Sequence, residues 1–171
     1  LINNGARVIA IDKVYNREIF KNYEIDFKKV DIKNILAVKK FANYVKKKYK
    51  KIDALLNISG ITDPNNFKKN IDNNLVGPFN LISNLIKVIK KNGTGSIVNI
   101  TSLNAELGFS DNPGYNSSKG GLKLLSKSLG IDFAKYNIRV NNIGPGYFLT
   151  DMTKKFYRQK KARKLRLSRI P

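Results

Sequence analysis

The sequence predicts an α/β fold built on a doubly wound parallel sheet. Short apolar runs alternate with longer stretches whose apolar residues recur at helical spacing. Strands that alternate with helices pair in parallel, because each strand returns to the sheet through a helical crossover. Right-handed crossovers then place ligands at the carboxyl ends of the strands.

The first half of the chain supplies two expected strands and one expected helix. Residues 7–12 form a short apolar run that ends in Asp12, as a buried parallel strand does. Residues 35–50 carry apolar side chains at helical spacing. Residues 52–58 are expected to form the next strand, and the turn residues Gly60 and Pro64 follow it.

The second half continues the alternation. We expect a helix over residues 73–91 that ends at Asn92 and Gly93, a strand over 96–100, a long helix over 115–136 and a strand over 138–143. No repeat and no linker rich in Pro, Gly or Ser divides the chain. The sequence therefore predicts a single domain over residues 1–171.

Composition narrows the chemistry. The chain contains no His and no Cys, so disulfides are impossible and proton transfer falls to Asp, Glu, Lys or Tyr; we expect no metal site. No run approaches 18 consecutive apolar residues, so we expect no membrane span and a cytoplasmic protein. The formal charge of +21 comes from 33 basic and 12 acidic residues. Because the lysines are scattered over helix faces, we interpret this positive charge as compositional bias rather than as a nucleic-acid-binding surface.

Tyr115 and Lys119 form the most informative pair. They lie four residues apart in an expected helix, so they share one helical face. A phenol is a poor base at its reference pKa of about 10, but a neighbouring ammonium group favours the phenolate. The spacing predicts an activated phenol, although an isolated Tyr at a helix start and a solvated Lys are the ordinary alternatives.

Five motifs occur in order along the chain: Asn-Ile-Ser-Gly at 57–60, Asn-Leu-Val-Gly at 74–77, the run 95–102 that ends in Ser102, Tyr115-x-x-x-Lys119, and Asn-Asn-Ile-Gly-Pro-Gly at 141–146. Together they resemble the classical short-chain dehydrogenases/reductases over the whole chain. The resemblance implies a Rossmann-like NAD(P)-binding domain. It also implies an oxidoreductase that moves a hydride between nicotinamide and a secondary alcohol or ketone, as in 3-oxoacyl carrier-protein reductases or sugar and polyol dehydrogenases.

The resemblance also implies the catalytic residues. Tyr115 handles the proton, and Lys119 lowers the phenol pKa and hydrogen-bonds the nicotinamide ribose. Ser102 hydrogen-bonds the substrate oxygen, for which helix or turn capping is the alternative reading. Asn74 matches the asparagine whose backbone carbonyl holds a water next to the lysine, although Asn73 lies beside it.

The implied cofactor residues begin with Asp12, which accepts hydrogen bonds from the adenosine ribose. A carboxylate there repels a 2′-phosphate and favours NAD over NADP, while Lys13 softens that preference. The pair next to the adenine is Asp31 and Ile32. The remaining implied contacts are Asn57, Ser59, Gly60, Tyr115, Lys119, Pro145, Gly146, Phe148 and Thr150.

The expected phosphate-binding glycines would fall before residue 1, because they precede the ribose acid by about 20 residues. The family also continues after the position of Pro171 into another helix and a last strand. The resemblance therefore implies a chain truncated at both ends, with the first and last strands of the sheet missing. The interval from Asn57 to Asn74 also looks short for the family. When full length, the protein is expected to form a homodimer or homotetramer. The alternatives are an inactive fragment, or a basic binding module that uses residues 154–169.

Overall fold

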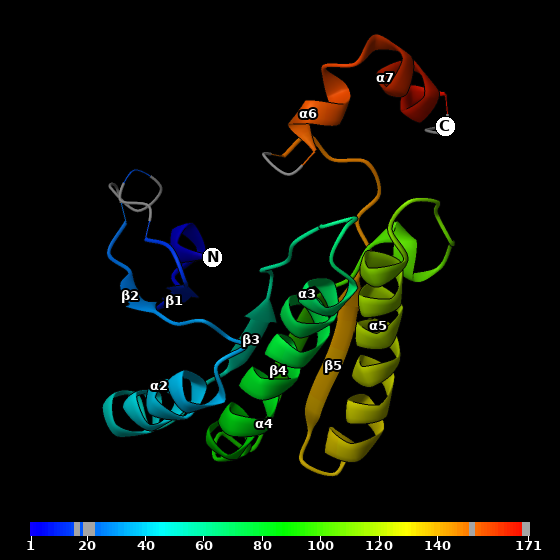
Figure 1. The fold of residues 1–171 in the computed structure, drawn as a ribbon. Coiled ribbons are helices and arrows are strands. Elements are labelled where there is room, and N and C mark those ends of the chain that lie inside the picture. Colours follow the sequence, from blue (N-terminus) through cyan, green and yellow to red (C-terminus); the bar gives the residue numbers. More distant parts are fainter. Residues whose placement is uncertain (16–17, 19–22, 151–152, 169–171) are drawn as a thin grey trace.

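The fold consists of parallel strands that alternate with helices from β2 onward (Figure 1). A computed structural model describes residues 1–15, 18, 23–150 and 153–168. Its strands form two sheets, and every pairing in them is parallel. One sheet pairs β1 (Ile9–Asp12) with β2 (Asp26–Lys29), and the other has the order β3 (Ala54–Asn57), β4 (Gly95–Ile100), β5 (Ile138–Ile143). The predicted α/β class is confirmed.

Three long helices make the crossovers: α2 (Ile35–Lys48), α4 (Gly77–Lys90) and α5 (Pro113–Ala134). The shorter turns are η1 (Ile2–Asn4), α3 (Phe67–Ile71), the π-helical η2 (Asp72–Val76), η3 (Leu103–Ala105), α6 (Lys154–Tyr157) and α7 (Lys160–Leu167). None of the helices in the described ranges is long and apolar enough to cross a bilayer.

Asparagine side chains fix where several helices begin. Asn34 accepts hydrogen bonds from the backbone N–H groups of Leu36 and Ala37 at the start of α2. Asn66 caps α3 and Asn112 caps α5 in the same way. Each cap satisfies an N–H group that has no partner within its helix.

The helix expected from residue 73 starts earlier, at Phe67, because Asn66 caps a helical segment that runs through α3 and η2 into α4. The strand expected over 52–58 is shorter, and the strand β2 was not predicted at all. Its sequence, Asp-Phe-Lys-Lys, contains a single apolar residue, so no apolar run marks it. The segment is a strand because its backbone pairs with β1. That pairing depends on the tertiary structure and cannot be seen in the local sequence.

Two apolar clusters hold the elements together. The first packs α2 against α4 through fully or nearly buried residues that include Val38, Val45 and Leu85. The second joins α4 to β4 and β5 through Ile89, Ile97 and Ile138, among others. Buried residues of α4 belong to both clusters, and Leu55 of β3 packs against both, so these two elements connect α2 to β4 and β5.

Candidate functional site

Lys119 lies on the inward face of α5 and is 4% exposed. Its Nζ donates a hydrogen bond of 2.7 Å to the backbone carbonyl of Ile100, the last residue of β4. Burial lowers the pKa of Lys119 from 10.5 to about 8. The same Nζ lies 5.8 Å from the centre of the Tyr115 ring. The predicted pair is therefore brought together at the carboxyl end of β4.

Gly60 brings a third segment to the amine. A Cβ atom at this position would lie 3.3 Å from Lys119 Nζ and 3.4 Å from Asn74 Oδ1. The turn after β3 thus approaches Lys119 more closely than a side chain comfortably allows. A glycine at position 60 lets the backbone come this close. Gly60, Asn74 and Lys119 therefore form one cluster.

Asn74 connects that turn to α5. Its fully buried side chain accepts a hydrogen bond from the Ile61 N–H at 2.9 Å and donates to the Ile61 carbonyl, also at 2.9 Å. It also donates to Ser118 Oγ at 3.0 Å, and Ser118 Oγ donates to the Tyr115 carbonyl at 2.7 Å. Asn73 instead donates to the Lys69 carbonyl within its own helix. These contacts favour Asn74 over Asn73 as the residue that belongs to the site.

The π-helical geometry of η2 contributes to this arrangement. Asn74 lies within η2, which separates α3 from α4 in one continuous helical segment. Single π-helical turns within α-helices are frequent at functional sites, because the wider turn changes where side chains point.

Ser102 follows β4 and is joined to the helix that carries Tyr115. Its Oγ accepts a hydrogen bond from the Asn104 N–H and donates to Asn104 Oδ1, both at 3.2 Å. Asn104 Nδ2 donates in turn to Asn116 Oδ1 at 2.7 Å. The capping role considered for Ser102 is present, since it is the N-cap of η3. The cap also fixes the hydroxyl relative to α5, at the residue next to Tyr115.

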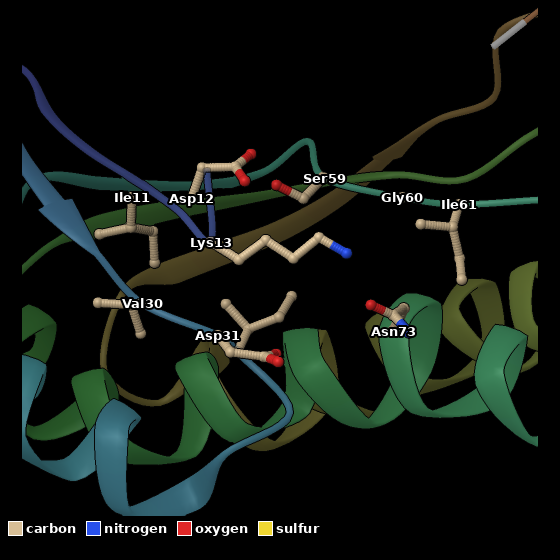
Figure 2. Close-up of a pocket in the computed structure, with 10 residues that line it drawn as sticks. Ile11, Asp12, Lys13, Val30, Asp31, Ser59, Gly60, Ile61 and Asn73 are labelled. Carbon is tan, nitrogen blue, oxygen red and sulfur yellow. The ribbon is translucent and has the colours of Figure 1, made fainter. Parts of the chain in front are cut away.

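A small crevice collects much of the expected cofactor set (Figure 2). Its volume is about 150 Å³, and it lies where β1, β2 and β3 end. Ligands in open α/β sheets bind at such carboxyl ends. The predicted residues in its lining are Asp12, Asp31, Ile32, Ser59 and Gly60; the others are Ile11, Lys13, Val30, Ile61 and Asn73.

The side chain of Lys13 extends along the crevice, with Asp12 and Ser59 on one side and Asp31 on the other (Figure 2). Asp12 accepts a hydrogen bond from the Val14 N–H at 3.0 Å, so its carboxylate caps the turn after β1. Asp31 accepts one from the Lys33 N–H at 3.0 Å in the same way. The crevice therefore has two carboxylates on its walls and one ammonium between them.

Other predicted residues lie outside the lining of this crevice. Asn57 is buried and donates to Asn99 Oδ1 at 2.7 Å, which links β3 to β4. The residues Pro145, Gly146, Phe148 and Thr150 follow β5. Within that segment the Pro145 carbonyl accepts a hydrogen bond from the Leu103 N–H at 3.1 Å, while Phe148 is 65% exposed. Their cofactor role stays a prediction.

Sequence reasoning missed Ser118, Asn104 and Asn116, which carry the hydrogen bonds that hold Asn74 and Ser102 to α5. A signal existed for Ser118 alone: it lies three residues after Tyr115, on the same helical face. The role of Asn104 depends on how η3 packs against α5, which no local pattern reveals.

Parallel strands that are linked by helical crossovers, with a crevice at their carboxyl ends, define an open α/β fold of the Rossmann type. The family of that class follows from comparison. The family model described as short chain dehydrogenase matches residues 1–161. The chain therefore belongs to the short-chain dehydrogenase/reductase family.

Individual relatives agree with this family. The chain is 39% identical over 110 residues to a 2-dehydro-3-deoxy-D-gluconate 5-dehydrogenase from Formosa agariphila, an alignment that covers 60% of this chain and 42% of the relative. It is 37% identical over 145 residues to the 3-oxoacyl-[acyl-carrier-protein] reductase FabG of Thermotoga maritima, covering 78% and 57% of the two chains. The chain thus spans about half the length of the curated relatives it matches.

Solved structures give the same result. A 4-hydroxyisoleucine dehydrogenase mutant complexed with NADH and succinate superimposes with a TM-score of 0.88 at 28% identity. The match covers 96% of this chain and 72% of that one. The structure titled ElxO with NADP bound superimposes with a TM-score of 0.84 at 26% identity, covering 92% and 70%.

Proposed function

We propose that the protein is an NAD(P)-dependent oxidoreductase that interconverts a secondary alcohol and a ketone, with Ser102, Tyr115 and Lys119 as its catalytic residues. One observation carries the proposal: the Lys119 amine is buried, has its pKa lowered to about 8, and lies 5.8 Å from the centre of the Tyr115 ring. An ordinary surface lysine shares none of these properties.

The nicotinamide cofactor, when bound, supplies or accepts the hydride. The residues of this chain handle the proton and the positioning. Tyr115 gives its phenolic proton to the carbonyl oxygen during reduction, or takes it from the hydroxyl during oxidation. Burial lowers the pKa of Lys119 to about 8, and its amine lies 5.8 Å from the centre of the Tyr115 ring, where a positive charge stabilises negative charge that develops during the reaction. When substrate is bound, the O–H of Ser102 turns from Asn104 Oδ1 to the reacting oxygen and stabilises the charge that develops there, while the Asn104 N–H still donates to Ser102 Oγ.

The supporting shell keeps these groups in place. Asn74 and Ser118 tie the turn at Ile61 to the backbone of Tyr115. Asn104 holds the hydroxyl of Ser102 against α5 through Asn116. Positioning of this kind matters because misplacement by about 1 Å can reduce turnover on the order of 10²-fold.

The residues of the crevice fit one end of a nicotinamide dinucleotide. Gly60 leaves room for close approach beside Lys119, since a Cβ there would lie only 3.3 Å from Nζ. Asp12 and Asp31 offer acceptors for ribose and base. The crevice of about 150 Å³ is small compared with ligand pockets of about 300–1,000 Å³. We therefore propose that it receives the adenosine end, with NAD preferred over NADP because of Asp12.

The substrate class is part of the same proposal. The relatives named above act, by their names, on a gluconate derivative and on a 3-oxoacyl group. Both descriptions support a substrate with a hydroxyl or keto group, and we propose that this protein acts on such a molecule as a cytoplasmic homodimer or homotetramer. We further propose that residues 1–171 belong to one dinucleotide-binding domain.

A second candidate is a catalytically inactive member of the family. The observation that favours it is the division of the strands into two sheets, in which β1 and β3 do not pair with each other. A cofactor that spans both sheets requires them to keep a fixed separation.

Replacing Tyr115 by Phe tests the proposal. The change removes the transferable proton and keeps the ring, so turnover of a small ketone with NADH should fall by about 10²–10⁴-fold. Binding of NADH should change by no more than a few-fold. Tyr23→Phe is the matched control, because Tyr23 is 46% exposed and lies before β2. Turnover of Tyr115→Phe equal to that of the control contradicts the assignment, and a wild type without turnover favours the inactive candidate.

A further inference from the structure

Positive charge is concentrated in and around α2. Residues 32–52 contain eight Lys and no Asp or Glu, so these 21 residues contribute +8 to the formal charge of +21 on the chain of 171. The sequence alone does not show whether the eight charges lie together, because a helix distributes neighbouring residues around its axis. The packing of α2 decides which of them share a face.

Four lysines of α2 lie on the side of the helix that faces away from the core. The core-facing side carries four apolar residues, each at most 8% exposed, which pack toward α4: Val38, Phe41, Ala42 and Val45. Successive residues of a helix turn by about 100°. The outward lysines therefore fall within about 120° of the circumference. We call these exposed side chains the lysine stripe: Lys39, Lys40, Lys46 and Lys47.

The lysine stripe consists of two rows. Lys39 and Lys46 are seven residues apart, so they lie almost in line along the helix, and Lys40 and Lys47 form the second row in the same way. Asn43 is exposed and lies between the two rows. At a rise of about 1.5 Å per residue, the stripe extends over about 12 Å of the helix axis.

No carboxylate neutralises the lysine stripe within the part of the chain that the structure describes. None of the ion pairs formed there includes any of its four side chains. Lys48, the residue after the stripe, instead pairs with Asp26 at 3.0 Å. The helix dipole favours cations in the last turn of α2, where half of the stripe lies, but not near its start, where the other half lies. The stripe is therefore uncompensated positive charge, which fits a polyanionic partner.

The kind of polyanion follows from what else α2 presents. An amphipathic helix binds a membrane by inserting its apolar face, but the apolar face of α2 is buried against α4. Single-stranded nucleic acid is bound by stacking its bases on aromatic rings. The aromatic residues of α2 are Phe41, which is buried, and Tyr44, whose hydroxyl donates to Asp26. The stripe therefore fits the phosphates of a duplex, whose bases are already stacked on one another.

The major groove of B-form DNA matches the stripe in size. This groove is about 12 Å wide and admits an α-helix, whereas the major groove of duplex RNA is deep and narrow. With the middle of the stripe over the groove, each row of lysines reaches the phosphates of one strand. About 12 Å of duplex carries about seven phosphates, which is enough for four ammonium groups. Asn43 alone faces the base edges, so little sequence preference is expected.

We propose that the lysine stripe of α2 binds the major groove of double-stranded DNA through its phosphates, with little dependence on base sequence. Lys39 and Lys46 contact one strand, and Lys40 and Lys47 contact the other. Compositional bias explains why the chain is rich in lysine, but it does not explain why one helix face collects lysines without any acid. The proposal does not depend on the proposed catalytic activity and uses none of its residues.

Two variants of equal charge test the proposal. The stripe variant combines Lys39→Gln, Lys40→Gln, Lys46→Gln and Lys47→Gln. The control combines four changes at exposed basic residues of α7: Lys160→Gln, Lys161→Gln, Arg163→Gln and Lys164→Gln. Each variant loses four positive charges. Gln has a helix propensity close to that of Lys and Arg, so both variants should keep the melting temperature of the wild type within a few degrees.

Fluorescence anisotropy with a labelled DNA duplex of about 20 base pairs measures binding between about 50 and 200 mM KCl. The wild type should bind with a Kd of about 1–100 μM at the lowest salt concentration. The stripe variant should bind at least about tenfold more weakly, and its slope of log K against log salt should be shallower by about three to four. The control should stay within about threefold of the wild type. Equal losses in the two variants would mean that affinity follows net charge alone, which overturns the proposal.

Lysine acetylation of the wild type is a second test, and it needs no variant. The DNA duplex should protect the amines of the stripe from acetylation more than those of Lys87 and Lys127, which are exposed on α4 and α5. Mass spectrometry measures the modification at each residue, and equal protection contradicts the proposal.

Other polyanions distinguish the groove from a general attraction to negative charge. Duplex RNA and single-stranded DNA of the same sequence should bind more weakly than the DNA duplex at the same salt concentration. Equal or tighter binding of either would exclude recognition of the major groove. Binding to phosphatidylserine vesicles that the stripe variant abolishes, with no binding to the DNA duplex, would identify a membrane-binding surface instead and overturn the proposal.

Discussion

Lys119 Nζ donates a hydrogen bond of 2.7 Å to the carbonyl oxygen of Ile100. This contact joins the middle of α5 to the end of β4, and Ser102 follows only two residues later. A buried amine therefore satisfies the last carbonyl of β4. The position of the amine relative to Tyr115 is consequently set by the sheet as well as by the helix.

The first prediction concerns Lys119 and the pH dependence of stability. Burial lowers its pKa to about 8 from 10.5, so between these values the unfolded chain holds a proton that the folded chain has lost. The free energy of unfolding should then rise with pH across this window, by up to about 1.4 kcal/mol per pH unit. Lys119→Met should lack this rise, as measured by urea unfolding at pH 7.5, 8.5 and 9.5.

The control for this prediction is Lys127→Met, on the exposed side of the same helix. It should keep the slope of the wild type, because all other titrating groups are common to the three proteins. Parallel stability curves for Lys119→Met and the wild type would mean that Lys119 is not desolvated in solution.

The second prediction uses two glycines of α5. A Cβ at Gly114 would lie 2.8 Å from the Cα of Phe67 at the start of α3, so Gly114→Ala should lower the free energy of unfolding by about 1–3 kcal/mol. A Cβ at Gly120 meets nothing within 4 Å, so Gly120→Ala should raise it by about 0.5–1 kcal/mol through helix propensity. Thermal and urea unfolding measure both. Equal effects of the two changes would show that α3 and α5 do not pack as described.

The third prediction concerns Asp26, which joins β2 to α2. Burial raises the pKa of its carboxyl, but hydrogen bonds from Lys28, Tyr44, Tyr49 and Lys48 outweigh this and hold the pKa well below its usual range. The associated stability is present above the unfolded pKa of about 3.9 and is lost as the pH falls below it.

Asp26→Asn should therefore lower the free energy of unfolding at pH 7 by about 1–3 kcal/mol. The free energy of unfolding of Asp26→Asn should also decrease less on acidification than that of the wild type, because the titrating carboxyl is gone. Asp72→Asn removes an ion pair to Lys68, whose side chain is 83% exposed, and should change stability by less than about 1 kcal/mol. Urea titrations at pH 7 and at about pH 2.5, which lies below the unfolded pKa, distinguish the two variants. Indistinguishable results would exclude a stabilising role for the Asp26 cluster.

The fourth prediction concerns cofactor choice and rests on the proposed function. Asp12 and Lys13 both line the crevice and act in opposite directions on a 2′-phosphate. With Asp12 dominant, NADH should bind more tightly than NADPH, and Lys13→Ala should widen the difference by about tenfold or less. Asp12→Asn should reduce the difference in affinity between NADH and NADPH. Fluorescence titration of both cofactors measures these affinities, and tighter NADPH binding by the wild type would show that Lys13 dominates.

The sequence by itself determined the features that have a local origin. Apolar periodicity placed α2, β4, α5 and β5 within a few residues, because each buries one face or both faces of a regular element. The spacing of four residues between Tyr115 and Lys119 put both side chains on one helical face, as the ring-to-amine distance shows. The five ordered motifs were enough to indicate the family to which the chain belongs.

The tertiary structure alone decided the features that depend on partners distant in sequence. β2 contains one apolar residue and exists because β1 offers it an edge. Asn74 reaches Ser118 only because η2 packs against α5, and Lys119 is buried only because β4 ends beneath it. Local patterns report which face of an element is buried, whereas the packed structure determines what covers it.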